Sequence, residues 1–208
     1  MATDPDTRER PAQITARGAA TRRRIVEAAA ELMRANGVSA TTLDAVRAGS
    51  QTSKSQLYRY FHTKEELVQA VIELQGTRIL IRETGRLAHL DSLRGLERWR
   101  DAIVQGNTLR NGAYGCVLGS LANELADADE EARVALAGHL QAWEDLLAAG
   151  FERMRDKGVL RADADPRTLA VGMMAALQGG YLLAQTRRGS EPMAVALDMA
   201  IEHVRTFT

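Results

Sequence analysis

The side chains best able to bind a charged partner gather between Ser53 and Lys64. This segment holds two lysines, one arginine, one glutamine and two tyrosines. Lysine and tyrosine side chains often hold phosphate oxygens, whereas amide and guanidinium groups can also bond base edges in the major groove. Taken singly, each of these residues could be a half-buried packing tyrosine or a solvated cation. Their joint occurrence instead predicts contact with DNA.

Three helix starts are marked close to these side chains. At each one, a hydroxyl that can cap a helix precedes by three positions a side chain that can reach back to it. The pairs are Thr41 with Asp44, Ser53 with Gln56, and Thr63 with Glu66. Between the first two starts, the polar run Gly49–Thr52 predicts a tight turn. Because Leu57 and Phe61 would anchor the second helix inward, the segment predicts a helix-turn-helix.

The segment from about Thr21 to Ile72 resembles the N-terminal domain of TetR-type transcriptional regulators, and Ser53–Phe61 matches the family's recognition-helix signature. The resemblance implies a preceding helix, which the apolar spacing from Thr21 to Asn36 supports. The family usually carries glycine where this chain has Gln51. A left-handed backbone there costs a non-glycine residue about 1 kcal/mol. We therefore expect the turn to differ locally while the second helix is kept.

The resemblance also assigns roles to individual positions. Four residues match family positions that mostly contact phosphates: Thr42, Lys54, Tyr58 and Lys64. Four others match positions where the family varies its contacts to choose an operator: Ser55, Gln56, Arg59 and Tyr60. Within the second group, we expect Arg59 and Gln56 to read bases.

Charge is divided unevenly along the chain. The whole sequence is neutral, with 27 basic and 27 acidic residues. Residues 1–64 hold 11 of the basic and 6 of the acidic side chains, so the remainder is acidic. A basic front end would attract DNA, and an acidic remainder would be repelled by it.

The chain is expected to be all-α and to divide into three segments. Residues 1–18 show no apolar period and predict a mobile tail, residues 19–64 a helix-turn-helix DNA-binding domain, and residues 65–208 a larger helical ligand-binding and dimerisation domain. A connecting helix should leave the first domain through Leu67–Leu74. Further helices are predicted at 93–108, 116–126, 130–155, 166–188 and 193–204.

The last two helices, about residues 166–204, are expected to form a homodimer interface. From Leu169 to Leu183, apolar residues surround most of the helix circumference, so this helix should be buried on all sides. In TetR-type regulators the corresponding pair docks against its copy. The alternative is an ordinary core pair of a monomer. A dimer would place two reading helices about one DNA turn apart, as a palindromic operator requires.

The resemblance further implies a pocket in the C-terminal domain, whose small-molecule effector shifts the connecting helix and spreads the two reading heads. Aromatic and methionine side chains suit an adaptable apolar pocket. The candidate lining residues are Trp99, Tyr114, Cys116, Leu118, Leu121, Trp143, Leu147, Met173, Met174 and Leu177. For any one of them, an ordinary place in a helical core is the alternative.

Cys116 is the sole cysteine and lies in the glycine-rich run Asn111–Ser120. One hypothesis is that a helix N-terminus lowers the pKa of its thiol and makes Cys116 a redox or electrophile sensor. The other is a small buried apolar residue, which we favour because no basic residue or second cysteine lies near it in sequence. A single cysteine also fits a reducing cytoplasm.

The remaining features favour a binding protein that is neither an enzyme nor a membrane protein. The four histidines are scattered, and no HExxH, G-x-S-x-G or P-loop motif occurs. No metal or cofactor is expected, and no apolar run predicts a signal peptide or membrane span. A helical small-molecule carrier is the alternative from another class. We expect a cytoplasmic, dimeric, ligand-responsive regulator that is a repressor, as most of the resembling family are.

Overall fold

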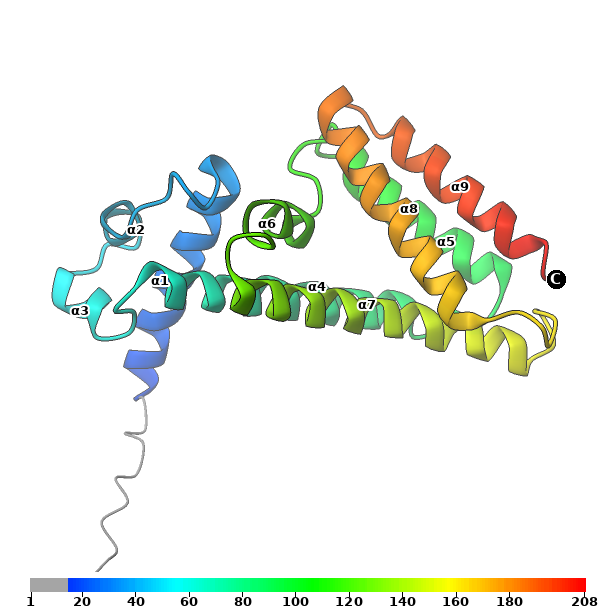
Figure 1. The fold of residues 1–208 in the computed structure, drawn as a ribbon, viewed down its shortest axis with the longest axis horizontal. Coiled ribbons are helices and arrows are strands. Elements are labelled where there is room, and N and C mark those ends of the chain that lie inside the picture. The colour runs from blue at the N-terminus through cyan, green and yellow to red at the C-terminus, as the bar shows by residue number, and fades with distance from the viewer. Residues whose placement is uncertain (1–14) are drawn as a thin grey trace, which may run out of the picture.

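The computed structural model describes residues 15–208, and the regular structure in that range is entirely α-helical (Figure 1). The helices are α1 (Ala16–Asn36), α2 (Leu43–Gly49), α3 (Lys54–Tyr58), α4 (Lys64–Leu87), α5 (Leu93–Thr108), α6 (Val117–Leu125), α7 (Glu130–Asp156), α8 (Pro166–Arg187) and α9 (Glu191–Arg205). The predicted all-helical class is confirmed. The five helices predicted after residue 92 agree with α5 to α9 to within two residues at each end.

The start of α1 differs from the sequence prediction. The hydroxyl of Thr15 accepts a hydrogen bond from the backbone N–H of Gly18, which caps the helix at Ala16. The last three residues of the predicted tail, 1–18, are therefore helical, because a hydroxyl cap satisfies an N–H group that would otherwise lack a partner. Thr15 of that predicted tail is the cap itself, and residues 1–14 lie outside the described residues.

The start of α2 also differs, by one residue. Thr42 rather than Thr41 is the cap, and its hydroxyl accepts from the backbone N–H of Ala45. Thr41 is buried and donates its hydroxyl to the carbonyl oxygen of Gly37 at 2.8 Å. Because a buried hydroxyl needs a partner inside the protein, Thr41 is not free to cap. The caps predicted at Ser53 and Thr63 are confirmed.

The head, residues 16–61, is joined to the body, residues 64–208, through α4, which packs against both α1 and α7 (Figure 1). α4 and α7 run side by side in the same direction. A Cβ atom at Gly76 would lie 2.3 Å from the ring of His139, and one at Gly150 would lie 2.3 Å from Leu90. The lack of a side chain at these two glycines therefore permits the close approach of the paired helices.

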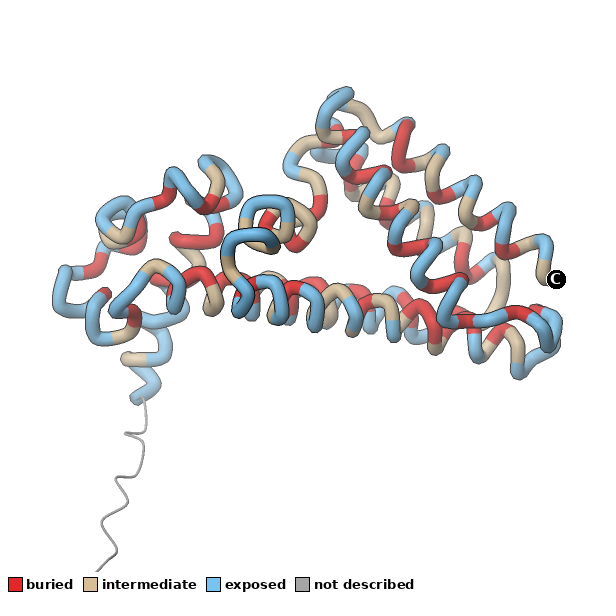
Figure 2. Tube along the Cα trace, in the orientation of Figure 1, coloured by how far each residue is buried: buried red, intermediate tan, exposed pale blue. Residues whose placement is uncertain are grey.

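The body is closed by α5, α8 and α9, with α8 packed on α7 and α9, and α5 packed on α9. The buried residues run through head and body (Figure 2). Within this core, the carboxylate of Glu83 on α4 is fully buried and accepts a 3.0 Å hydrogen bond from the indole N–H of Trp99 on α5. Arg82 and Arg86 pair with the same carboxylate at 2.7 and 2.9 Å. These partners compensate the buried charge and tie α5 to α4.

The expectation that α8 is buried on all sides is not met within a single chain. The faces of α8 on α7, on α9 and on the glycine-rich run before α6 are covered, but its outer face leaves three large apolar side chains exposed: Val171, Leu182 and Leu183. On α9, Val195 and Met199 are exposed as well. The last two helices thus present apolar side chains to solvent.

Candidate DNA-binding surface and ligand cavities

The short helix α3 is fixed in place by a capping box and by two buried side chains. The Ser53 hydroxyl accepts from the N–H of Gln56 at 3.1 Å, and the Gln56 side-chain oxygen accepts from the N–H of Ser53 at 2.9 Å. This capping box satisfies two N–H groups at once. Leu57 and Phe61 are only 1% and 2% exposed, so they fix α3 on the core of the head. Together these contacts determine which face of α3 is turned outward.

Most of the predicted DNA-binding residues are exposed on the surface of the head. The exposed ones are Thr42, Lys54, Ser55, Gln56, Tyr58 and Arg59. Tyr60 is partly buried against the core, and Lys64 is partly buried with its ammonium group donating to the carbonyl oxygen of Ser39 at 3.1 Å. The ammonium of Lys54 lies 5.8 Å from the centre of the Tyr58 ring. Because the oxygen of the Gln56 amide belongs to the capping box, its NH₂ group is the part left to bond a base or phosphate.

The turn before α3 has the left-handed backbone conformation that glycine adopts most easily. Gln51 has φ +53°, in the left-handed region, so the expected local difference in the turn is not found. Two contacts hold this conformation. The Ser50 and Thr52 hydroxyls bond each other at 2.9 Å, and Arg24 of α1 donates to the carbonyl oxygen of Ser50 at 3.0 Å. One local and one tertiary contact thus offset the cost of a left-handed glutamine.

Sequence reasoning missed the arginines of α1 that support this surface. Besides Arg24, the guanidinium carbon of Arg22 lies 5.2 Å from the centre of the Phe61 ring. Both arginines reach residues far along the chain, so no local pattern marks the contacts.

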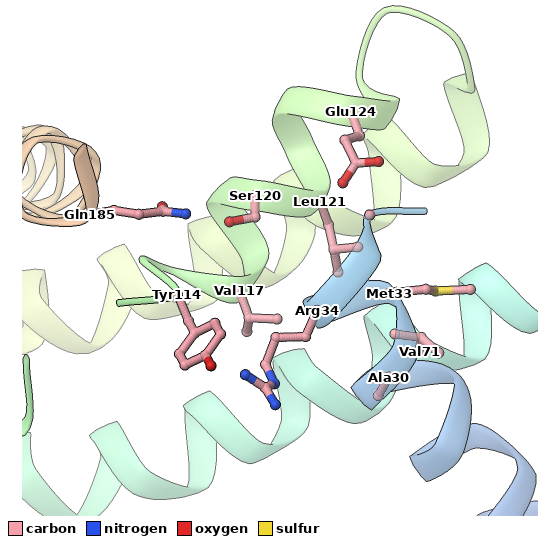
Figure 3. Close-up of a pocket in the computed structure, with 11 residues that line it drawn as sticks. Ala30, Met33, Arg34, Val71, Tyr114, Val117, Ser120, Leu121, Glu124 and Gln185 are labelled. Carbon is pink, nitrogen blue, oxygen red and sulfur yellow. The ribbon is translucent and has the colours of Figure 1, made fainter. Parts of the chain in front are cut away.

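Two neighbouring cavities lie where the head meets the body. The junction cavity, about 170 Å³, is bordered by α1, α4 and α6 and includes Arg34, Tyr114 and Glu124 in its lining (Figure 3). Figure 3 shows Arg34 of α1 extending toward Tyr114, and their guanidinium carbon and ring centre are 4.3 Å apart. On α6, Glu124 accepts from the backbone N–H of Val38 at 2.7 Å. The cavity is therefore framed by contacts between head and body.

The arginine cavity, about 230 Å³, lies beside the first and shares Arg34, Tyr114 and Val117 with it. Its other cationic lining residues are Arg78, Arg82 and Arg110. A third hollow of about 360 Å³ lies between α6 and α8 and contains Cys116 and Tyr181. Burial raises the pKa of Tyr181 to about 12, although Arg82 and Arg110 act in the opposite direction.

The predicted pocket residues divide between cavity walls and core. Tyr114, Cys116, Leu121 and Trp143 line these cavities. The other six candidates are buried in the core outside these linings: Trp99, Leu118, Leu147, Met173, Met174 and Leu177. Trp99 is committed to Glu83 through its indole N–H. The candidates predicted from the sequence are apolar, aromatic or sulfur-containing, and the arginines are not among them, because only the packing of distant helices brings the arginines together.

The glycine-rich run before α6 makes a tight packing turn, and Cys116 ends it. A Cβ atom at Gly112, whose φ is +70°, would lie 2.4 Å from the carbonyl oxygen of Ala184. Cys116 is buried, and desolvation raises the pKa of its thiol above the ordinary value despite its place at the start of α6. Since the reactive thiolate is thereby disfavoured, the structure supports the small buried residue over the sensor.

Within residues 15–208, no group of three or more histidine, cysteine, aspartate or glutamate side chains is placed to hold a metal ion. No helix in the same range combines the length and apolarity needed to cross a membrane.

Residues 25–71 match the model described as bacterial regulatory proteins of the tetR family, and residues 92–200 match the model described as the tetracyclin repressor-like C-terminal domain. The chain belongs to the TetR family. It is a DNA-binding transcriptional regulator, and the matched N-terminal segment contains α2, α3 and the turn between them.

Individual relatives of this TetR-family chain agree along most of its length. The transcriptional regulator AcuR of Cereibacter sphaeroides is 28% identical over 92% of this chain and 90% of that protein. The transcriptional repressor DhaR of a Mycobacterium species is 25% identical, with 87% and 90% covered. A regulatory protein TetR from Rhodobacter sphaeroides superposes with a TM-score of 0.75 at 24% identity, over 88% of this chain and 98% of that one. This last likeness shows the fold.

Proposed function

We propose that this TetR-family chain is a homodimeric repressor that binds a palindromic operator through α3 and is released by a small-molecule effector. Residues 19–64, together with the first three residues of α1 at 16–18, would be its DNA-binding domain and residues 65–208 its ligand-binding and dimerisation domain. The observation that carries the proposal is the array of exposed donors on α3, seated on the core by Leu57 and Phe61. The name of the relative DhaR as a repressor supports the direction of control.

Within this proposal, the side chains of the head divide by task. Thr42, Lys54, Tyr58 and Lys64 hold phosphates and set the position of the head on the duplex. Ser55, Gln56, Arg59 and Tyr60 face the bases, with Arg59 and the Gln56 NH₂ group as the readers. Arg59 is exposed, at the C-terminal end of α3, which suits a long side chain that must reach a base edge.

The proposed dimer is formed by α8 and α9 against the same pair in a second copy. Val171, Leu182 and Leu183 of α8 and Val195 and Met199 of α9 are the exposed apolar side chains that such an interface would cover. Covering apolar surface of this kind drives association. Leu182 and Val134 are both 55% exposed, and Val134 lies on α7, outside the proposed interface. Leu182→Glu should therefore yield monomers in analytical ultracentrifugation, whereas Val134→Glu should remain dimeric.

We propose that this regulator acts by binding DNA and effector, without enzymatic activity, and that it works in the cytoplasm, where it meets DNA. Selection of bound duplexes from a random library, at near-physiological salt, tests its DNA-binding role. Recovery of a palindrome is the expected result. Retention without sequence preference would contradict operator binding and favour a small-molecule carrier with incidental phosphate affinity.

A further inference from the structure

The arginine cavity collects side chains from four parts of the chain. Arg34 comes from α1, Arg78 and Arg82 from α4, Arg110 from the segment before α6, and Trp143 from α7. All of these side chains carry hydrogen-bond donors and, apart from the indole of Trp143, a positive charge. Such a wall is suited to oxygen atoms that bear negative charge.

The acidic residues nearby do not balance the positive charge of this cavity. Glu31 pairs with Arg34 at 2.6 Å, and Glu27 pairs with Arg78 at 3.0 Å. Glu83 is shared between Arg82 and Arg86. Among the ion pairs within residues 15–208, Arg110 has no carboxylate, and its Nε donates to the backbone carbonyl of Gly106. The cavity thus holds guanidinium groups with spare donors, which carboxylates match with two parallel bonds.

Trp143 adds a donor that the described protein leaves unpaired. Its side chain is 1% exposed, yet its indole N–H has no hydrogen-bond partner within residues 15–208. A buried donor without a partner is uncommon in folded proteins, and one explanation is an acceptor supplied from outside the chain. Because Trp143 lines the arginine cavity, a ligand there can supply that acceptor.

We propose that the arginine cavity binds a small organic carboxylate, and that this anion is the effector of the repressor proposed above, on which the inference rests. Arg110 and Arg82 bond the carboxylate. The unpaired Trp143 indole N–H donates to the same carboxylate, and Ile79 and Val117 cover a short apolar body. The volume of about 230 Å³ is below the range usual for drug-sized ligands, so the ligand is small.

The other two arginines of this cavity, Arg34 and Arg78, connect it to the DNA-binding head. Arg34 belongs to α1 and stacks on Tyr114, and Arg78 of α4 bonds Glu27 of α1. An anion that draws Arg78 toward itself competes with Glu27 of α1, and one that draws Arg34 away from Tyr114 removes a second contact between α1 and the body. Both changes weaken the hold of the body on α1. The anion would then bind more tightly to the state in which these contacts are broken than to the state in which they are intact. Its binding would therefore shift the head away from the DNA-bound arrangement.

Calorimetric titration of the full-length protein without DNA tests the binding claim. The probes are acetate, butyrate and hexanoate, each beside its neutral amide, with inorganic phosphate as a further anion. We expect saturable binding of at least one carboxylate and none of its amide at the same concentration. An amide that binds as well as its carboxylate would overturn the proposal, and so would phosphate binding as tightly as the carboxylates.

Substitutions at two arginines locate the site. Arg110→Gln should weaken carboxylate binding about tenfold, the effect of losing one charge-assisted hydrogen bond. Arg94→Gln, on the exposed surface of α5, should bind as the parent protein does. Arg110→Lys serves as a second variant if Arg110→Gln fails to fold. It keeps the charge but loses the two-pronged geometry, so its binding should also weaken. Unchanged binding by a folded Arg110 variant would place the anion elsewhere.

Operator binding provides a separate outcome. With the palindrome recovered by selection, the bound carboxylate should release the parent protein, and Arg110→Gln should require about ten times more of it. A carboxylate that binds without releasing DNA would overturn its role as effector. If a palindrome is selected but no carboxylate binds, this inference fails while the proposed operator binding stands.

Discussion

The head and the arginine cavity are built in opposite ways. The reading surface of the head comes from one short segment, in which the capping box and the anchors Leu57 and Phe61 lie within nine residues of one another. The arginine cavity instead draws Arg34, Arg82 and Trp143 from three separate helices. A surface encoded locally keeps its geometry when distant parts of the chain change. A cavity assembled from several helices responds to any shift between them, which suits a site that must transmit a signal.

The largest expected difference between the two regions follows removal of a buried aromatic ring. Phe61→Ala should cost the head about 3–5 kcal/mol and abolish DNA binding. The matched change in the body is Phe151→Ala, which removes an equally buried ring from α7. Hydrogen exchange resolved by segment should show faster exchange in residues 16–61 for the first variant, with α8 and α9 still protected. Equal loss of protection throughout the chain would show that head and body do not unfold separately.

The reactivity of Cys116 probes the tightness of the body. Burial raises the pKa of the thiol, so alkylation by iodoacetamide at about pH 8 should be about a hundredfold slower in the native protein than in denaturant. Above about pH 9, the unfolded thiol ionises while the native thiol stays protonated. The contribution of Cys116 to the free energy of unfolding is therefore lost as pH rises. Mass spectrometry of the time course measures the rates. Rapid native alkylation would restore the sensor hypothesis.

Substitutions on the reading surface should separate its two proposed tasks. Arg59→Ala should reduce discrimination at one operator position by about 1–3 kcal/mol. Lys64→Ala should weaken binding to all sequences alike. It should also reduce the slope of log K against the logarithm of salt concentration by about one, because one phosphate contact is lost. Titrations against the operator, single-base variants and random duplex check both. If Arg59→Ala weakened binding to operator and random DNA equally, Arg59 would be a phosphate contact.

The smallest expected effect concerns the turn before α3. Gln51→Gly should raise the free energy of unfolding by about 0.5 kcal/mol, because glycine relieves the left-handed strain but adds entropy to the unfolded chain. Gln105→Gly, within α5, should lower it by about 1 kcal/mol. Urea denaturation measures both. Destabilisation by Gln51→Gly would show that the glutamine side chain itself supports the turn.

Local chemistry accounts for most of what could be predicted of the fold. The caps at Ser53 and Thr63 and the bounds of α5 to α8 follow from side chains within a few residues of each boundary. The error at Thr41 arose because neighbouring threonines are equivalent as caps until burial takes one of them away. The start of α1 was missed although Thr15 is an ordinary capping residue, since the apolar period that marked the helix begins later.

The sequence by itself determined the helix-turn-helix, the order of the helices and the family, because these depend on short patterns of capping, apolar spacing and exposed donors. Only the tertiary structure decided which cavity residues meet. It committed Trp99 to Glu83, kept Gln51 left-handed with help from Arg24 and gathered the arginines around Trp143. Contacts between residues far apart in the chain depend on how whole helices pack, and no local pattern encodes that packing.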